Sequence, residues 1–251
     1  MATKQSELVK VKPISLATTE VRIEGLSELI MHQWSEKAKK EMLSNMQKNK
    51  QSEIGPVKTK KREDKCPVDD FIQSMYWITK KPSKEAIEKM DEVYAKLRDE
   101  TNEASGYSLY ELAERAGCFE EVEGARFGFP AKAFKAAAIS GAYRKHWTPD
   151  KMSLRGVFFI LGDYEDLVEI KGAVPVIRED PVRVGKDGTD LRYRGSFQNW
   201  YADLQVQFDH NGTYSPEDLI NYINAGGFMC GVGEWRVEKD GDAGMFQVAT
   251  N

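Results

Sequence analysis

Apolar and polar residues alternate along the first part of the chain, with the period of two that is typical of a strand buried on one face. The apolar positions of this pattern are Val9, Val11, Ile14, Leu16, Val21 and Ile23. The alternation breaks at Thr18 and Thr19, and it therefore predicts two strands joined near these threonines. Further on, residues 48–67 combine lysines with a glycine and two prolines, which predicts a flexible basic loop.

The middle of the chain changes to the period of an α-helix. Apolar residues recur there three and four positions apart, at Ile87, Met90, Val93 and Leu97. A second helix is expected to begin at Ser108, because Glu111 three positions later completes the signature of a capping box. We predict a helical insertion over residues 80–122, and a core domain made of residues 1–79 and 123–251.

The C-terminal half returns to strand-like runs with one well-marked helix. Residues 157–161 are continuously apolar and predict a central strand, and residues 202–208 alternate and predict a second strand. Ser215 is a favourable N-cap for a helix that we expect to end at Gly226. A last strand is expected over residues 245–248.

This order of elements predicts the fold class. A strand, a capped helix, a glycine-rich loop and a final strand make half of a ferredoxin-like β-α-β unit. The N-terminal strands and the alanine-rich helix after Pro130 supply the other half. We therefore expect an α+β protein with a ferredoxin-like antiparallel sheet, of the kind found in RNA-recognition domains, that carries a helical insertion.

Composition is that of a globular protein, with uneven charge. The 251 residues are 41% apolar and 30% charged. No apolar run approaches the roughly 20 residues of a membrane span, and the N-terminus lacks the apolar segment of a secretory signal. We expect a cytoplasmic protein with no membrane partner. Its net charge is −4, but residues 37–65 hold ten Lys/Arg against four Asp/Glu, which leaves −10 for the rest.

The sequence gives no sign of metal or cofactor chemistry. Cys66, Cys118 and Cys230 are widely spaced without a C-x-x-C pair, which argues against a disulfide framework and a zinc site. The three histidines also lack metal-ligand spacing. Gly231 and Gly233 form a G-x-G, but the third glycine, the preceding strand and the following helix of a dinucleotide site are missing. We expect neither a metal nor a cofactor.

The stretch GFPAKAFKAAAISGAYRKHW, residues 128–147, is the first candidate for binding chemistry. Its alanines are expected to pack against a sheet. A glycine-bounded turn that leads into a helix offers free N–H groups to an anion, and basic residues cluster near both helix ends. These cations are Arg126, Lys132, Lys135, Arg144 and Lys145. They predict phosphate contacts, and a solvated helix face stays open as the alternative.

Two further stretches combine cations with aromatic residues or glycines. Arg192 and Arg194 occupy alternate positions of an expected strand, so both point to one face and suit a polyanionic backbone. The glycine-rich loop near the C-terminus contains Gly231, Gly233, Trp235 and Arg236. Its glycines permit close approach of a ligand strand, while the tryptophan can stack on a base and the arginine can pair with a phosphate. A hairpin with an ordinary core tryptophan is the alternative.

Signatures of catalysis are few. The chain has no G-x-S-x-G motif, and its carboxylates are scattered. His32 or His146 can in principle act as a general base for RNA cleavage. An endoribonuclease is therefore kept as an alternative to the non-catalytic protein that we favour.

Two of these stretches resemble parts of the RAMP superfamily, which includes the Cas7-like backbone proteins of CRISPR complexes. GFPAKAFKAAAI is similar to a family segment in which a proline precedes a small-residue turn, an apolar residue, a lysine and a small-residue helix. The matching positions are Phe129, Pro130, Phe134, Lys135 and Ala136. GGFMCGVGEWRVEKDGDAGMF resembles the glycine-rich loop before the last strand of that family, but its acidic residues argue against close phosphate contact at the loop itself. They are Glu234, Glu238, Asp240 and Asp242.

The resemblance implies a RAMP-type ferredoxin-like core and a non-catalytic protein that forms filaments along single-stranded RNA or DNA, with RNA favoured. Lysines and arginines would hold the phosphates, and the helical insertion or the basic loop would contact neighbouring copies. Other CRISPR-like or phage subunits are possible partners, and a phage-encoded stand-alone relative fits the short chain. The alternative is a phage structural or assembly protein that self-associates without nucleic acid.

Overall fold

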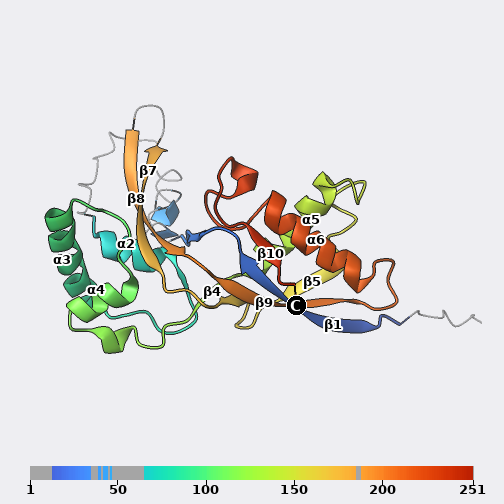
Figure 1. Cartoon of the computed structure of the whole chain (residues 1–251), viewed down its shortest axis with the longest axis horizontal. Coiled ribbons are helices and arrows are strands. Elements are labelled where there is room, and N and C mark those ends of the chain that lie inside the picture. Colours follow the sequence, from blue (N-terminus) through green and yellow to red (C-terminus); the bar gives the residue numbers. More distant parts are fainter. Residues whose placement is uncertain are drawn as a thin grey trace, which may run out of the picture.

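The computed structural model describes residues 13–34, 39–40, 42–44, 46, 65–184 and 188–250 (Figure 1). They form a mixed α+β structure with antiparallel sheets, as the sequence predicts. The strands are β1 (Leu16–Gly25), β2 (Leu29–Met31), β3 (Tyr76–Trp77), β4 (Phe127–Pro130), β5 (Phe158–Leu161), β6 (Leu167–Ile170), β7 (Val176–Val184), β8 (Gly188–Phe197), β9 (Tyr201–Asp209) and β10 (Phe246–Val248). The helices are α2 (Pro67–Ser74), α3 (Lys84–Thr101), α4 (Leu109–Arg115), α5 (Ala131–Arg144) and α6 (Pro216–Met229), with 3-10 turns η1 (Phe119–Glu121) and η2 (Val237–Lys239).

The largest sheet has four antiparallel strands in the order β10-β1-β9-β5. Along the chain its elements follow as strand, helix, strand, strand, helix, strand, namely β1, α5, β5, β9, α6 and β10. Helices α5 and α6 pack on one face, so that every second residue of β9 is buried. The opposite face stays open and carries mainly polar side chains. This sheet and its two helices position the site described below.

Two strand predictions are wrong. Thr18 and Thr19 do not turn the chain, because both pair with β9 in a strand that runs unbroken to Gly25. Val9 and Val11 lie outside the described residues, as does the predicted basic loop up to residue 64. The apolar strand β5 is not central, because in the described structure it pairs with β9 alone and stands at the sheet edge. Its residues accordingly alternate between buried and exposed.

Helices α5 and α6 cross at very short distance through small residues. A Cβ atom on Gly226 of α6 would lie 2.5 Å from the carbonyl carbon of Ala137 in α5. One on Gly141 of α5 would lie 2.4 Å from the backbone nitrogen of Gly226. Gly226 therefore does not end α6, as we predicted, but lies inside a helix that continues to Met229. The crossing explains why glycine stands there despite its cost of about 1 kcal/mol in a helix interior.

Two three-stranded sheets, β2-β8-β7 and β3-β4-β6, extend the structure beyond β1. The predicted helices between residues 80 and 122 are confirmed as α3 and α4, with Ser83 and Ser108 accepting hydrogen bonds as N-caps. Tyr94 of α3 packs edge-on against Tyr193 of β8, with the ring centroids 6.3 Å apart. The two helices thus lie beside the β7–β8 hairpin, away from α5 and α6 (Figure 1).

One continuous hydrophobic core joins these layers. Trp200, Phe134 and Phe158 are among its fully buried side chains. The rings of Phe134 in α5 and of Trp200 both pack edge to face against Phe246 of β10. None of the helices in the described part of the chain combines the length and the apolar content that a membrane span requires.

The helix crossing leads to a stability prediction. Gly226→Ala adds a methyl group where no space exists, so we expect the free energy of unfolding to fall by about 1–3 kcal/mol. Gly156→Ala is the matched control, because a Cβ atom there meets nothing within 4 Å and the change should stay within about 0.5 kcal/mol. Urea denaturation of the three proteins measures both effects. Equal stability of the two variants would contradict the close crossing.

Candidate functional site

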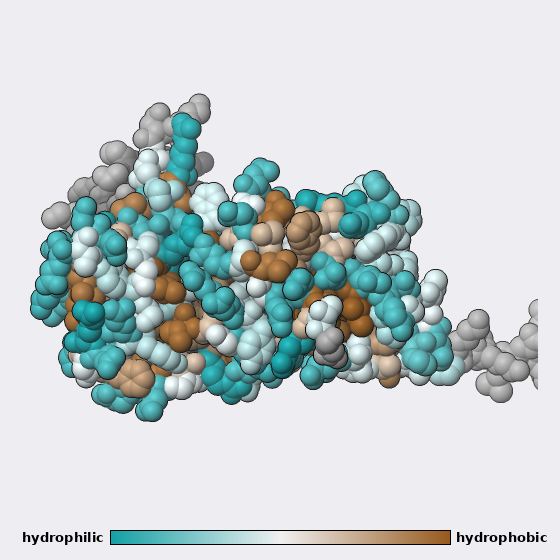
Figure 2. All heavy atoms as spheres, in the orientation of Figure 1, coloured by the Kyte–Doolittle hydropathy of each residue, from teal (hydrophilic) through white to brown (hydrophobic). Residues whose placement is uncertain are grey.

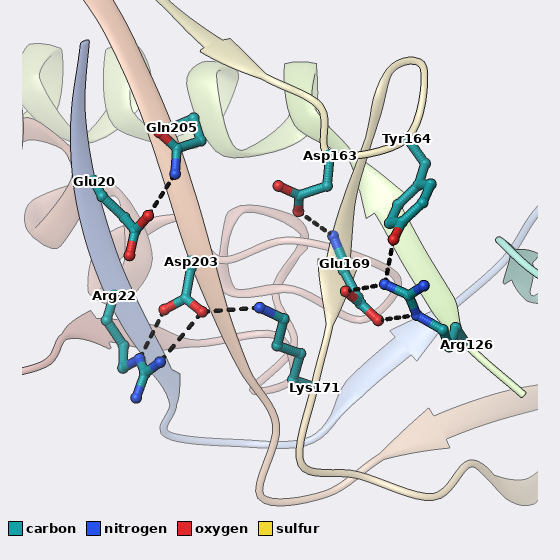
Figure 3. A network of polar contacts seen from close by, with 9 residues as sticks. All are labelled: Glu20, Arg22, Arg126, Asp163, Tyr164, Glu169, Lys171, Asp203 and Gln205. Carbon is teal, nitrogen blue, oxygen red and sulfur yellow. Dashed lines mark hydrogen bonds and ion pairs between the residues drawn. The ribbon is translucent and has the colours of Figure 1, made fainter. Parts of the chain in front are cut away.

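Many cations on the described surface are neutralised by carboxylates. The open face of the four-stranded sheet shows this pairing (Figure 3). Asp203 of β9 accepts hydrogen bonds from Arg22 at 2.7 Å and from Lys171 at 3.0 Å. Next to them Arg126, a predicted phosphate ligand, forms an ion pair with Glu169 at 2.6 Å, which raises the pKa of its guanidinium. The positive charge of Arg126 is therefore already matched on this face.

A second charge network lies between the β7–β8 hairpin and the segment around β2. Arg194 and Asp180 form an ion pair at 3.0 Å in which each side chain is only 7% exposed. Arg178 binds the same carboxylate at 2.9 Å and also contacts Glu28. Arg192 and Arg194 do occupy alternate positions of β8, as predicted. The guanidinium of Arg194, however, is buried in its ion pair and is not available to a ligand, whereas Arg192 is partly exposed.

The segment 131–156, which contains α5, differs from the rest in having almost no acidic residues. It holds six Lys/Arg and a single carboxylate, that of Asp150, so its net charge is +5. After α5 the chain runs back along the helix. Lys135 donates to the carbonyl oxygen of Arg155 at 2.7 Å, and Lys151 donates to the hydroxyl of Ser140 at 3.0 Å. The returning chain thus places Arg155 and Lys151 against α5, next to Lys135 and Ser140.

We call this surface the basic strip; it consists of Lys132, Lys135, Lys145, Lys151 and Arg155. Among the described residues, the charged groups of Lys132, Lys145 and Arg155 have no ion-pair or hydrogen-bond partner, and all three side chains are exposed. Lys135 is partly buried over the ring of Phe159, and this burial lowers its pKa. Trp147 follows Lys145 closely and is 48% exposed. The strip thus offers unmatched positive charge with an aromatic ring beside it.

The other side of α5 faces a cavity of about 230 Å³, here called the smaller cavity. Its helix wall is made of three alanines, and its opposite wall is the glycine-rich loop that follows α6. The alanines are Ala133, Ala136 and Ala137. The loop approaches closely because Gly231 and Gly233 adopt φ values of 67° and 84°, and because a Cβ atom on Gly233 would lie 2.5 Å from the carbonyl oxygen of Ile30.

The structure thus brings together two stretches that are about 100 residues apart in the sequence. Both were singled out by the sequence, and they form opposite walls of one cavity. Tyr76 and Phe129 close its end with rings packed edge to face at 5.6 Å. A larger cavity of about 330 Å³ lies beside it and is lined by Arg192, Trp34 and Tyr193, among other residues. The imidazole of His32 lines both cavities.

His32 is held in one tautomer by the buried ion pair. Its Nδ1 accepts a hydrogen bond from Nε of Arg194 at 3.3 Å, so the ring proton of the neutral form is carried by Nε2. Burial, followed by the charge of Arg194, lowers the pKa of His32 below its usual range. The side chain therefore contributes a neutral N–H donor. A general base at this position would need the opposite tautomer.

The remaining predicted residues lie around the glycine-rich loop. Arg236 lines the smaller cavity, where Glu238 at 3.3 Å and the carbonyl oxygen of Gly233 at 3.2 Å hold its guanidinium. Arg144 donates to the carbonyl oxygen of Met229 at 3.0 Å at the end of α6. Trp235 is exposed rather than a core residue. Neither arginine projects freely, whereas the tryptophan ring is accessible.

Three polar residues of the smaller cavity were not predicted as ligands, namely Tyr76, Glu234 and Glu238. Tyr76 lies in a short aromatic run of the sequence, and its pairing with β4 turns it toward the cavity. Glu234 stood in the sequence as an acidic residue that argues against phosphate contact. The sequence contains no signal that Tyr76 and Glu234 line the same cavity.

No protein-family model matches the chain, and neither a curated protein nor a solved structure matches it. Across the described residues, no group of three or more His, Cys, Asp or Glu is placed to hold a metal ion. The three cysteines are free thiols, and burial raises the pKa of Cys66 to about 12.

The buried ion pair leads to a second stability prediction. Asp180→Asn removes the charge that balances the buried guanidinium of Arg194, so we expect the free energy of unfolding to fall by about 3 kcal/mol. Glu111→Gln on α4 is the control, because Glu111 and its ion-pair partner Arg115 are 37% and 53% exposed. Pairs of that kind contribute less than about 1 kcal/mol. Denaturant titration compares the variants, and equal losses would count against the buried network.

Proposed function

We propose that this protein is a non-catalytic, cytoplasmic binder of single-stranded nucleic acid, with RNA favoured, and that copies of it assemble along the strand. The observation that carries the proposal is the basic strip on α5. Most other arginines on the described surface have a carboxylate partner, whereas the strip has five cations beside a single acidic residue. A group of cations without carboxylate partners suits a polyanion such as a nucleic-acid backbone.

The position of α5 supports a single strand rather than a compact anion. The helix carries the strip on one side and the wall of the smaller cavity on another, so a strand bound across it would meet cations and cavity together. Exposed aromatic rings, those of Trp147 and Trp235, offer stacking surfaces for bases. Unstacked bases reach such surfaces only in a single strand.

The strand order favours a ferredoxin-like assignment for the core. The order β10-β1-β9-β5, with α5 and α6 following the first and third of these strands in the chain, is that of a β-α-β-β-α-β unit. The long segments between β1 and α5 and between β5 and β9 would then be insertions into this unit. A RAMP-type relationship rests on the two resembling stretches alone, and these face each other across the smaller cavity.

Assembly is part of the proposal because apolar side chains remain exposed. Figure 2 shows hydrophobic surface over the region of α5 and α6, and Phe228 at the end of α6 is 64% exposed. Leu16 of β1 and Phe159 of β5 are also exposed on the open sheet face. Contacts between copies would cover such groups. The same feature suits the alternative of a phage assembly protein that binds no nucleic acid.

The charge of the basic strip leads to a binding prediction. A triple variant with Lys132→Gln, Lys145→Gln and Arg155→Gln should weaken binding to a 30-nucleotide RNA, whatever its sequence. Each lost phosphate contact removes about 0.7 from the slope of log affinity against log salt, so we expect the slope to shrink by about 2. Fluorescence anisotropy over a series of salt concentrations measures both quantities.

The control is a triple variant on α3 with Lys84→Gln, Lys89→Gln and Lys96→Gln. It removes the same charge from exposed positions on a helix that lies away from α5 (Figure 1). It should leave the salt slope unchanged. Equal effects of the two triple variants would show that only net charge matters and would remove the strip from the site. If the unaltered protein assembles but binds neither RNA nor DNA at low salt, the phage-assembly alternative replaces the proposal.

An endoribonuclease is less favoured by the geometry. His32 is the histidine that lines both cavities, but its accessible nitrogen carries the proton and its Nδ1 is occupied by Arg194. His146 follows α5 and is exposed, and it lines neither of these cavities. We therefore keep binding without cleavage as the proposal.

A further inference from the structure

The smaller cavity contains three polar groups that have no partner among the described residues. They are the carboxylate of Glu234, the hydroxyl of Tyr76 and the Nε2–H of His32. The charged groups around them are all matched, since Arg236 pairs with Glu238 and Arg194 with Asp180. All three side chains are half-buried and line the cavity, so their polar groups are available to a polar ligand.

The three groups lie near one another. Burial raises the pKa of Tyr76, and the charges of Asp166 and Glu234 add to this effect. Burial and Arg194 lower the pKa of His32, which Glu234 opposes, so the carboxylate of Glu234 lies near both side chains. Glu234 itself is fixed at the backbone, because its N–H donates to the carbonyl oxygen of Ile30 at 3.0 Å. The acceptor and the two donors therefore converge on the same space.

The walls of the cavity select for a flat ligand. One wall is the alanine side of α5, which has no side chain longer than a methyl group, and the facing wall is glycine-rich backbone. The rings of Tyr76 and Phe129 add an aromatic end. A volume of about 230 Å³ admits one heterocyclic ring system but not a longer segment of chain.

We propose that the smaller cavity receives one base of the bound strand and prefers guanine, an inference that rests on the proposed function. An ionised carboxylate is acceptor-only and has two oxygens. Guanine is the common base that presents two adjacent donors on its Watson–Crick edge, N1–H and the N2 amino group, and its O6 accepts from a neighbouring donor. Glu234 binds the two donors, and His32 or Tyr76 donates to O6.

The preference is measured with 15-nucleotide RNAs of uridine that carry guanine, adenine or cytosine at the central position, together with all-uridine RNA. The unaltered protein should bind the guanine RNA about tenfold more tightly than the other three, which is the discrimination of one good bidentate contact. Glu234→Gln replaces one acceptor oxygen with a donor. It should reduce the preference to less than about twofold and leave the affinity for all-uridine RNA unchanged.

Two further variants separate base recognition from a structural role. Tyr76→Phe keeps the ring and removes the hydroxyl, so it should lower the guanine preference without lowering the thermal midpoint. Glu100→Gln on α3 removes an exposed carboxylate elsewhere and should change neither quantity. Circular dichroism melting confirms that each variant is folded.

The outcomes separate this inference from the function on which it rests. Failure of the unaltered protein to bind any of the four RNAs would overturn the proposed function. Binding of all four with equal affinity would overturn the guanine site alone. A guanine preference that survives Glu234→Gln would overturn the assignment of Glu234 as its ligand. Loss of the preference in Glu234→Gln but not in Glu100→Gln would support that assignment.

Discussion

The close crossing of α5 and α6 is the constraint on which the candidate site depends. Glycine and alanine let the two helix backbones approach to a distance that excludes a side chain, and both helices then fit over one four-stranded sheet. The crossing fixes the rotation of α5 about its own axis. One side packs on the sheet and one on α6, which leaves the alanine side for the smaller cavity and the lysine side for solvent. A larger residue at the crossing would disturb all of these relations together.

Charge pairing determines where on this frame an anion is able to bind. An arginine matched by a carboxylate contributes little net field, and a buried pair such as Arg194 with Asp180 contributes stability instead. The basic strip contributes no such stability, because neighbouring like charges repel one another. A protein that carries 40 Asp/Glu has acidic residues enough to neutralise five cations, yet none but Asp150 stands in segment 131–156. Local arrangements that cost stability are expected at functional sites.

The elements that local sequence determines were predicted well, and those set by distant partners were not. The start of α6 is an example of the first kind, because Ser215 and Asp218 cap the helix through each other. The end of α6 is of the second kind. Gly226 has the local character of a stop, but a Cβ atom there would lie 2.5 Å from the backbone of α5, so the crossing requires glycine in mid-helix. The unbroken β1 and the edge position of β5 likewise depend on pairing with β9, more than 40 residues away in sequence.

The same distinction between local sequence and distant partners applies to the candidate site. Its two walls were predicted, because an alanine-rich helix and a loop with closely spaced glycines each have a recognisable composition. Their juxtaposition was not, since it follows from the helix crossing and from the hydrogen bond that ties the loop to Ile30. That juxtaposition changes the meaning of Glu234. In the sequence its charge argues against a phosphate, but on the wall of the proposed base site the same carboxylate would serve as a hydrogen-bond acceptor for the base. A carboxylate near a nucleic-acid site therefore opposes binding where it faces a phosphate, and it supports binding where it faces the hydrogen-bond donors of a base.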